Sequence, residues 1–232
     1  MKIYLKNNIL QDTEISEKAK LVYIALRSLM DNEAIHLFEI EDMLKIVRGK
    51  KERKQRAISK IQEGINRLAD CGLITVLNES DNGIKIDVSN LIFQTSKGGF
   101  AIIDKAIFSK IKEIETLNYS KAIVYFCILK STVNSKSKLG KTGIRKLSKY
   151  TGCSYSTLIK MNEAFEANGI MCIEKGNQYC ANKYSVCEFQ PETTKNNKDI
   201  EDINADIKDK ETVIDTTSEE ETDYYSHNPY LD

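Results

Sequence analysis

Apolar residues recur at helical spacing in three stretches of the first part of the chain. A spacing of three and four residues places side chains on one face of a helix, so this pattern predicts three successive helices. The three stripes are Val22, Ala25, Leu26 and Leu29; Ile40, Met43, Leu44 and Val47; and Ile58, Ile61, Ile65 and Leu68. Gly72 is expected to end the third helix. A β-hairpin is expected next, in the run LITVLNESDNGIKIDVS with its Asn-Gly pair at 82–83.

The second part of the chain repeats this order. AKLVYIAL at 19–26 aligns with KAIVYFCI at 121–128, and CGLITV at 71–76 aligns with NGIMCI at 168–173. Residues 122–129 are apolar throughout, so only this alignment assigns them to a helix. Two further apolar stripes follow, one with Ile144 and Leu147 and one with Leu158, Met161 and Phe165. Gly169 is expected to end the last helix, and a ribbon that turns at Gly176 and Asn177 is expected after it. The repeat predicts one duplicated fold of about 95 residues per copy.

Charge divides the chain into a basic body and an acidic tail. The 232 residues carry 34 Lys or Arg and 34 Asp or Glu, but residues 191–232 hold only 4 of the bases and 13 of the acids. The remainder, 30 bases and 21 acids in residues 1–190, gives that part a net charge of plus nine. The tail begins at Pro191 and has few large apolar residues, which predicts disorder. We therefore expect a first domain at 1–92, a second at 93–190 and a disordered acidic tail at 191–232.

Several classes of protein lack support in the sequence. No apolar run approaches the roughly 18 residues of a membrane helix, and the start MKIYLKNNIL lacks the apolar core of a signal peptide. A cytoplasmic location without membrane contact is expected. The six cysteines form no C-x-x-C pair and there are two histidines, so we expect buried thiols without a metal site or a disulfide framework. No phosphate-binding glycine loop, carboxylate pair or Cys–His arrangement is present, and His36 is expected in the core or in a strand. The expectation is a protein that is not an enzyme and needs no cofactor.

The second half resembles a known superfamily. Residues 144–179 read IRKLSKYTGCSYSTLIKMNEAFEANGIMCIEKGNQY, which is similar to the helix-turn-helix and wing of winged-helix proteins: an apolar first helix, a Gly-x-Ser turn, a second helix containing threonine and a closing Gly-Ile. The first half resembles it more loosely, because VRGKKERKQRA lengthens or replaces the tight turn. The resemblance implies a mainly α fold with small β-hairpin wings (α+β), arranged as two tandem winged helix-turn-helix domains. Tandem winged helices of this length are similar to plasmid and phage replication initiators and to replisome organisers of Gram-positive mobile elements.

This resemblance implies a DNA-reading surface in the second half. In a winged helix the third helix enters the major groove and the wing crosses phosphates. With the apolar stripe inside, the start of that helix projects polar side chains outward, and no Asp or Glu occurs between Ser131 and Asn162. The candidate DNA-binding residues here are Lys141, Arg145, Lys146, Ser154 (also the helix cap), Tyr155, Ser156, Thr157, Lys160 and Lys175. The alternative is an ordinary solvated face, which Lys136, Lys138 and Lys149 would also share.

The first half carries a denser basic run, KIVRGKKERKQRAISK, which also includes Lys45 and Arg48. Placed at the turn and the start of the third helix, it is expected to lie over the phosphate backbone. Its candidate DNA-binding residues are Lys50, Lys51, Arg53, Lys54, Arg56 and Lys60, with a solvated loop as the alternative. The acidic hairpin tip NESDNG at 78–83 departs from the superfamily pattern, because phosphate would repel it. The first ribbon is therefore expected to pack against a partner or a second copy instead.

Three functional hypotheses follow. The first is a sequence-specific double-stranded DNA-binding protein that acts in replication initiation or origin binding for a plasmid or phage. The second is a transcriptional regulator that binds an operator, and the third is a winged-helix adaptor for protein partners. The sequence is compatible with a monomer that binds two adjacent segments of the DNA groove and with a homodimer. The tail ends in DYYSHNPYLD, which is read either as a docking motif for a protein partner, as an inert solubilising segment, or as a segment that competes with DNA for the basic surfaces.

Overall fold

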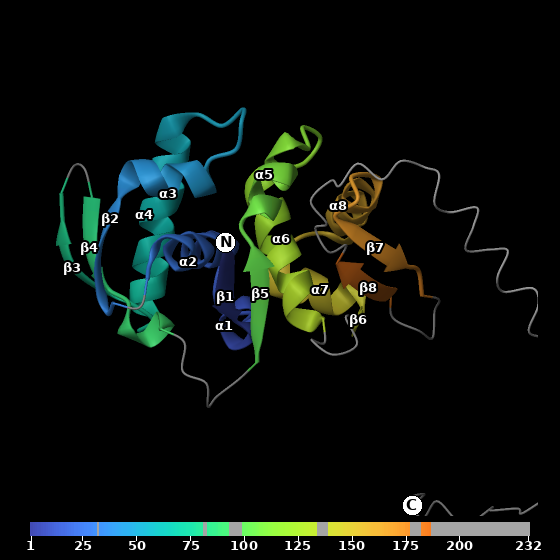
Figure 1. Ribbon diagram of the computed structural model, residues 1–232, viewed down its shortest axis with the longest axis horizontal. Coiled ribbons are helices and arrows are strands. Elements are labelled where there is room, and N and C mark those ends of the chain that lie inside the picture. The colour runs from blue at the N-terminus through green and yellow to red at the C-terminus, as the bar shows by residue number, and fades with distance from the viewer. Residues whose placement is uncertain (32, 81–82, 93–98, 134–138, 177–181, 187–232) are drawn as a thin grey trace, which may run out of the picture. The chain divides into compact units, whose positions relative to one another are not determined.

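The computed structural model describes residues 1–31, 33–80, 83–92, 99–133, 139–176 and 182–186 (Figure 1). These residues form a mixed α+β structure, as the sequence predicts. The predicted tail, Lys136, Lys138, and the turn residues Asn82 and Asn177 lie outside the described residues. In the part of the chain that the structure describes, no helix is long and apolar enough to span a membrane.

The two halves have the same order of elements, as the sequence repeat predicts. The first half comprises β1 (Lys2–Lys6), α1 (Asn7–Gln11), α2 (Glu17–Leu29), β2 (Ile35–Glu39), α3 (Ile40–Val47), α4 (Lys54–Asp70), β3 (Thr75–Glu79) and β4 (Gly83–Asp87), with a short 3₁₀ turn at Ser89–Leu91. The second half comprises β5 (Phe100–Asp104), α5 (Ala106–Glu113), α6 (Tyr119–Thr132), β6 (Leu139–Thr142), α7 (Ile144–Thr151), α8 (Tyr155–Ala167), β7 (Met171–Glu174) and β8 (Asn182–Val186). The predicted boundary at 92/93 falls between these repeats; the division into two domains stays a prediction.

Each half contains an antiparallel sheet with the same topology. The order is β2-β4-β3 in the first half and β6-β8-β7 in the second. The predicted hairpins β3-β4 and β7-β8 are confirmed, but the expectation of two-stranded ribbons is wrong, because β2 and β6 each add a third strand. Neither added strand has the apolar pattern that would predict it. Ile35 and Leu37 of β2 face outward, and β6 has the residues LGKT with one large apolar side chain.

The first strands of the two halves pair with each other. β1 and β5 form an antiparallel two-stranded sheet in which Tyr4 lies opposite Ile102. Side-chain hydrogen bonds also join the halves: among them, the Gln11 amide donates to the Ser131 hydroxyl (3.0 Å), and the Lys20 ammonium donates to the carbonyl of Tyr150 (2.5 Å). The described residues consequently form one compact unit with a continuous hydrophobic core.

Helices α2 and α6 occupy the centre of that core and contact each other (Figure 1). All residues from 19 to 26 and from 122 to 129 are buried. Their ends correspond as well, since Ser16 caps α2 and Asn118 caps α6 through side-chain oxygens. The helical assignment of 122–129 is confirmed. The single apolar stripe expected for α2 is too narrow, because a helix enclosed by other elements buries its whole circumference.

The predicted third helix of each half is confirmed as α4 and α8. Ile61, Ile65 and Leu68 of α4 are buried, and the stripe of α3 is buried at Met43, Leu44 and Val47. Gly72 and Gly169 follow these third helices with φ of 65° and 60°, in the left-handed region that favours glycine. The predicted terminators are therefore correct.

Candidate nucleic-acid interface

The turn between α7 and α8 is fixed by local hydrogen bonds. Gly152 has φ of 67° and ends α7, and the Ser148 hydroxyl donates to the carbonyl of Cys153 (2.7 Å). Ser154 then caps α8, because its hydroxyl oxygen accepts from the backbone N–H of Thr157 (3.3 Å). The predicted cap is confirmed, and it sets the direction in which the start of α8 leaves the core.

The two faces of α8 divide as the sequence predicts. Leu158, Met161 and Phe165 are buried, whereas Tyr155, Ser156 and Lys160 are exposed at the start of the helix. The side chain of Tyr155 is 48% exposed.

Two residues of α8 differ from the expectation. Thr157 is only half-buried rather than fully outward, and its hydroxyl lies 2.8 Å from that of Ser154. Ile159 is 47% exposed beside the predicted residues, and the sequence analysis missed it because an isolated exposed isoleucine carries no motif.

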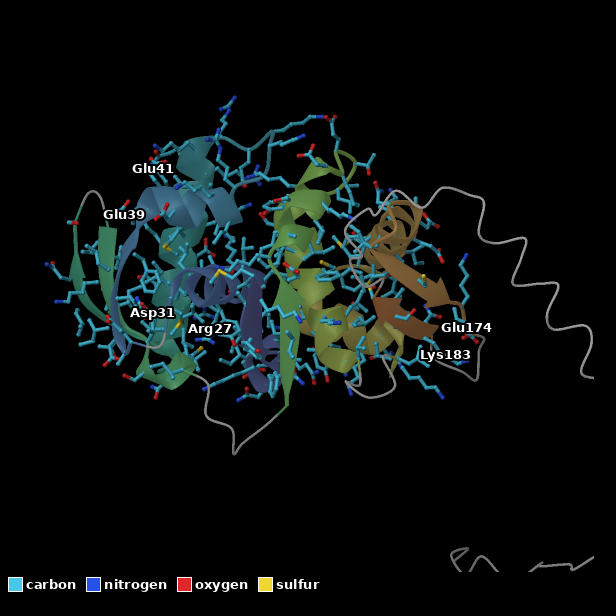
Figure 2. All side chains as sticks on the ribbon, in the orientation of Figure 1. Arg27, Asp31, Glu39, Glu41, Glu174 and Lys183 are labelled. Carbon is cyan, nitrogen blue, oxygen red and sulfur yellow. The ribbon has the colours of Figure 1, made fainter. Side chains whose placement is uncertain are left out.

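The described residues from β6 to β8 include six exposed cations besides Lys183. They belong to this half of the chain, on β6, on α7, on α8 and after β7, and none forms an ion pair with another described residue: Lys141, Arg145, Lys146, Lys149, Lys160 and Lys175. The Lys146 ammonium lies 5.6 Å from the centroid of the Tyr150 ring. Lys183 differs, because it pairs with Glu174 across the β7-β8 hairpin at 2.6 Å (Figure 2).

The basic run of the first half lies where it was predicted, at the α3–α4 turn and the start of α4, but carboxylates hold most of its lysines. Lys50 pairs with Glu113, and Lys51 pairs with Glu115 at 2.7 Å, so both partners come from the second half. Lys54 pairs with Glu41.

The side chain of Lys60 is more buried than those of Lys50, Lys51 and Lys54. It lies 2.6 Å from Glu52, and both side chains are about 15% exposed. Arg53 and Arg56 are exposed and have no carboxylate partner among the described residues. The expectation that the whole run lies ready for phosphate is therefore only partly met.

The four cysteines that the structure describes divide into two environments, and Cys180 and Cys187 lie outside the described residues. Cys127 and Cys153 are buried, and burial raises the pKa of both thiols. Cys71 and Cys172 are exposed, so the expectation that the thiols are buried is wrong for these two. His36 lies in β2, as predicted, with its Nε2 atom 3.0 Å from a carboxylate oxygen of Asp31.

The first sheet exposes large apolar side chains. Ile35 and Leu37 on β2 are 45% and 67% exposed, and Leu77 on β3 is 48% exposed. Packing of this hairpin against a partner stays a prediction, and part of its acidic tip lies outside the described residues.

The chain was compared with known proteins. Its sequence matches no protein-family model, and no curated protein is significantly similar to it.

Proposed function

We propose that the chain is a sequence-specific double-stranded DNA-binding protein made of two winged-helix repeats. The proposal is supported by the order of elements, since three helices followed by a β-hairpin are typical of a winged helix. This order occurs in α2, α3 and α4 with β3-β4, and again in α6, α7 and α8 with β7-β8. The fold class alone does not imply the function. The proposal therefore rests on the surface of the second half.

The observation that carries the proposal is the uncompensated charge around α7 and α8. Six exposed cations there lack an ion pair with any described residue, and residues 131–162 contain no Asp or Glu. Exposed cations without carboxylate partners can neutralise phosphates and release counterions, which is the main source of affinity for DNA. In the first half, by contrast, carboxylates already occupy Lys50, Lys51, Lys54 and Lys60.

The start of α8 supplies groups that discriminate between bases. Lys160 can donate to guanine, the Ser156 hydroxyl can donate to or accept from a base edge, and Tyr155 can pack on sugar or on a base. We assign phosphate contacts to Arg145 and Lys146 on α7. We assign Thr157 a structural role at the start of α8, because its hydroxyl is hydrogen-bonded to that of the cap residue Ser154.

The division of roles is tested by fluorescence anisotropy with a set of labelled duplexes. Lys146→Glu is expected to weaken binding to every sequence by about tenfold and to reduce the salt dependence, because it replaces a phosphate contact by a repulsive charge. Tyr155→Ala is expected to change the preference among sequences. Lys85→Glu is the matched control: it makes the same charge change on the exposed face of β4 and is expected to leave affinity within about twofold. Equal losses in the variant and its control would refute the proposal.

We further propose that the biological role is origin binding in plasmid or phage replication. Its support is the tandem repeat, which places two helix-turn-helix units on one chain and is similar to the arrangement in such initiators. Binding sites that occur as direct repeats beside the chain's own gene would support initiation. A single inverted repeat over a promoter would favour a transcriptional regulator instead, and retention of DNA affinity after charge reversal at Arg145, Lys146 and Lys160 would favour a protein adaptor.

A further inference from the structure

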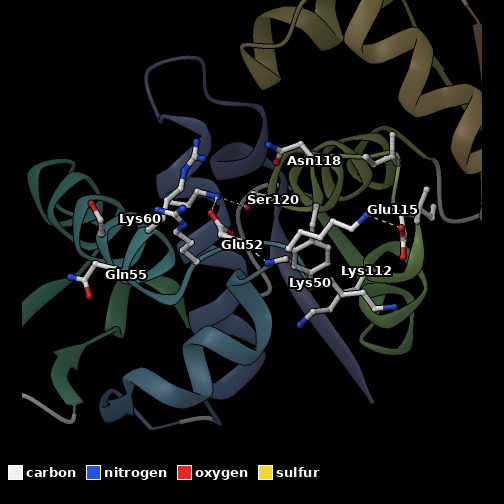
Figure 3. A pocket seen from close by; sticks show the side chains of 16 residues that line it. Lys50, Glu52, Gln55, Lys60, Lys112, Glu115, Asn118 and Ser120 are labelled. Carbon is white, nitrogen blue, oxygen red and sulfur yellow. Dashed lines mark hydrogen bonds and ion pairs between the residues drawn. The ribbon is translucent and has the colours of Figure 1, made fainter.

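A cleft of about 790 Å³ lies between the α3–α4 turn with the start of α4 on one side and the segment from α5 to α6 on the other (Figure 3). This volume falls within the range of about 300–1,000 Å³ typical of small-molecule sites. The cleft does not include residues of α7 or α8. It is therefore distinct from the surface to which we assign DNA recognition.

Cations outnumber carboxylates in the lining of this cleft. Its acids are Glu52 and Glu115, and Glu113 beside the cleft pairs with Lys50. The cations exceed these three acids by three: Lys50, Lys51, Arg53, Arg56, Lys60 and Lys112. A concave surface lined by one sign of charge concentrates the field and attracts counterions of the opposite sign. The charge of the cleft thus favours an anionic ligand.

Three of these cations have no carboxylate partner in the described part of the chain. Arg53 and Arg56 are exposed on the α4 side. Lys112 faces them from the α5 side, where its ammonium lies 3.3 Å from the carbonyl oxygen of Lys45 and 5.5 Å from the centroid of the Tyr119 ring. The planar guanidinium groups can each donate two parallel hydrogen bonds to a phosphate.

The inner part of the cleft is ordered by Lys60. Its ammonium donates to the hydroxyl of Ser120 (2.8 Å) and lies 2.6 Å from Glu52 (Figure 3). An ammonium has three donors, so one donor of Lys60 remains for a ligand after these two contacts. Ser120 is 3% exposed, so this contact lies in the most buried part of the cleft lining.

We propose that this cleft binds a free polyphosphate, of the chemical class of a nucleoside triphosphate. A triphosphate carries about three to four negative charges, which match the excess of three cations better than the one to two charges of a single phosphate do. The lining also includes Ile114, Leu117 and Tyr119, which supply an apolar wall for an organic group. Glu113 and Glu115 already hold Lys50 and Lys51 here, so a bound triphosphate would replace these ion pairs by its own.

The test is isothermal titration calorimetry of the full chain with inorganic triphosphate and with ATP, without divalent metal, at about 0.15 M salt. We expect saturable binding at one site. The double variant Arg53→Gln, Arg56→Gln is expected to weaken it by about tenfold or more, because it removes two charge-assisted donors. The matched double variant Lys146→Gln, Lys149→Gln removes the same charge outside the cleft and is expected to leave binding within about twofold. Absence of saturable binding, or equal weakening in both variants, would overturn the proposal.

Duplex titrations of the same two variants separate this inference from the proposed function. DNA affinity is expected to fall in the Lys146, Lys149 variant, and a saturating duplex is expected to leave triphosphate bound to the wild-type chain. If a duplex displaces triphosphate and the arginine variant loses both ligands equally, the cleft belongs to the DNA surface and the proposal is wrong. If the chain binds triphosphate as expected but no duplex, the inference stands and the proposed function fails.

Discussion

Lys20 provides a direct test of how the two halves are held together. It lies on α2 with 1% of its surface exposed, and its ammonium donates to the carbonyl of Tyr150 in the last turn of α7 (2.5 Å). Burial lowers the pKa of Lys20 to about 8, against a smaller opposing effect of the Asp12 carboxylate. A charge buried at this position therefore costs stability when it is protonated. The perturbation that reveals the cost is Lys20→Met, which keeps the aliphatic volume and removes the charge.

The size and sign of the effect follow from the two pKa values. Lysine in the unfolded chain has a pKa of about 10.4, so the unfolded state binds more protons than the folded state between roughly pH 8 and pH 10.4. The contribution of Lys20 to the free energy of unfolding thus rises with pH across this window, and its full cost is present below about pH 8. Between pH 7 and pH 9.5 the rise amounts to about 2 kcal/mol.

Urea unfolding of both proteins at the two pH values measures this rise. The quantity compared is the free energy of unfolding of Lys20→Met minus that of the wild type. We expect this difference to fall by about 2 kcal/mol from pH 7 to pH 9.5, because the wild type gains stability over this range and the variant lacks the titrating group. The subtraction cancels the titration of other groups, such as Tyr23 and Cys127. Lys18→Met is the control, because its side chain is 44% exposed, and its difference is expected to change by less than about 0.5 kcal/mol. A difference for Lys20→Met that is the same at both pH values would refute the reasoning.

Two further predictions concern the packing of the core. Gly64→Ala would place a Cβ atom 2.4 Å from a methyl carbon of Val22, so urea unfolding should show a loss of about 1–3 kcal/mol or more. Gly143→Ala meets nothing within 4 Å at a φ of −78°, so this control should be neutral or stabilising by up to about 1 kcal/mol, and equal losses in both would contradict the packing argument. Tyr125→Phe removes the hydroxyl that donates to Asn162 (2.6 Å) in the interior, and unfolding should show a loss of about 1–3 kcal/mol; unchanged stability would contradict the role of this bond.

The helices could be predicted because their signals are local. The apolar stripes of α4 and α8 and the glycines that follow them lie within one element and its cap, and all of them appear in the structure. The duplication could be detected in the sequence because α2 and α6 are both surrounded by other elements of the core. This burial favours apolar residues around the whole helix.

The pairing of strands could not be derived in the same way. β1 does alternate, with Ile3 and Leu5 buried between exposed residues, and this weak signal could have indicated a strand. Nothing local shows that its partner is β5, which lies nearly one hundred residues away. Strand β2 was missed for the opposite reason, since two of its apolar side chains face outward.

The candidate site shows the same limit. Sequence reasoning placed Ser154 at the cap and Tyr155 on the outside of α8 correctly, because both positions follow from helical spacing. It could not show that Lys50 and Lys51 have carboxylate partners on the second half, because Glu113 and Glu115 come close only through the tertiary fold. The cleft that these residues line follows from the same long-range packing.

Selection of bound duplexes from a random DNA library, with the full chain at about 0.15 M salt, tests the central claim most directly, because salt suppresses non-specific binding. We predict the enrichment of a defined sequence motif and a change of that motif in Tyr155→Ala. Recovery of no motif by a folded protein would contradict sequence-specific DNA recognition.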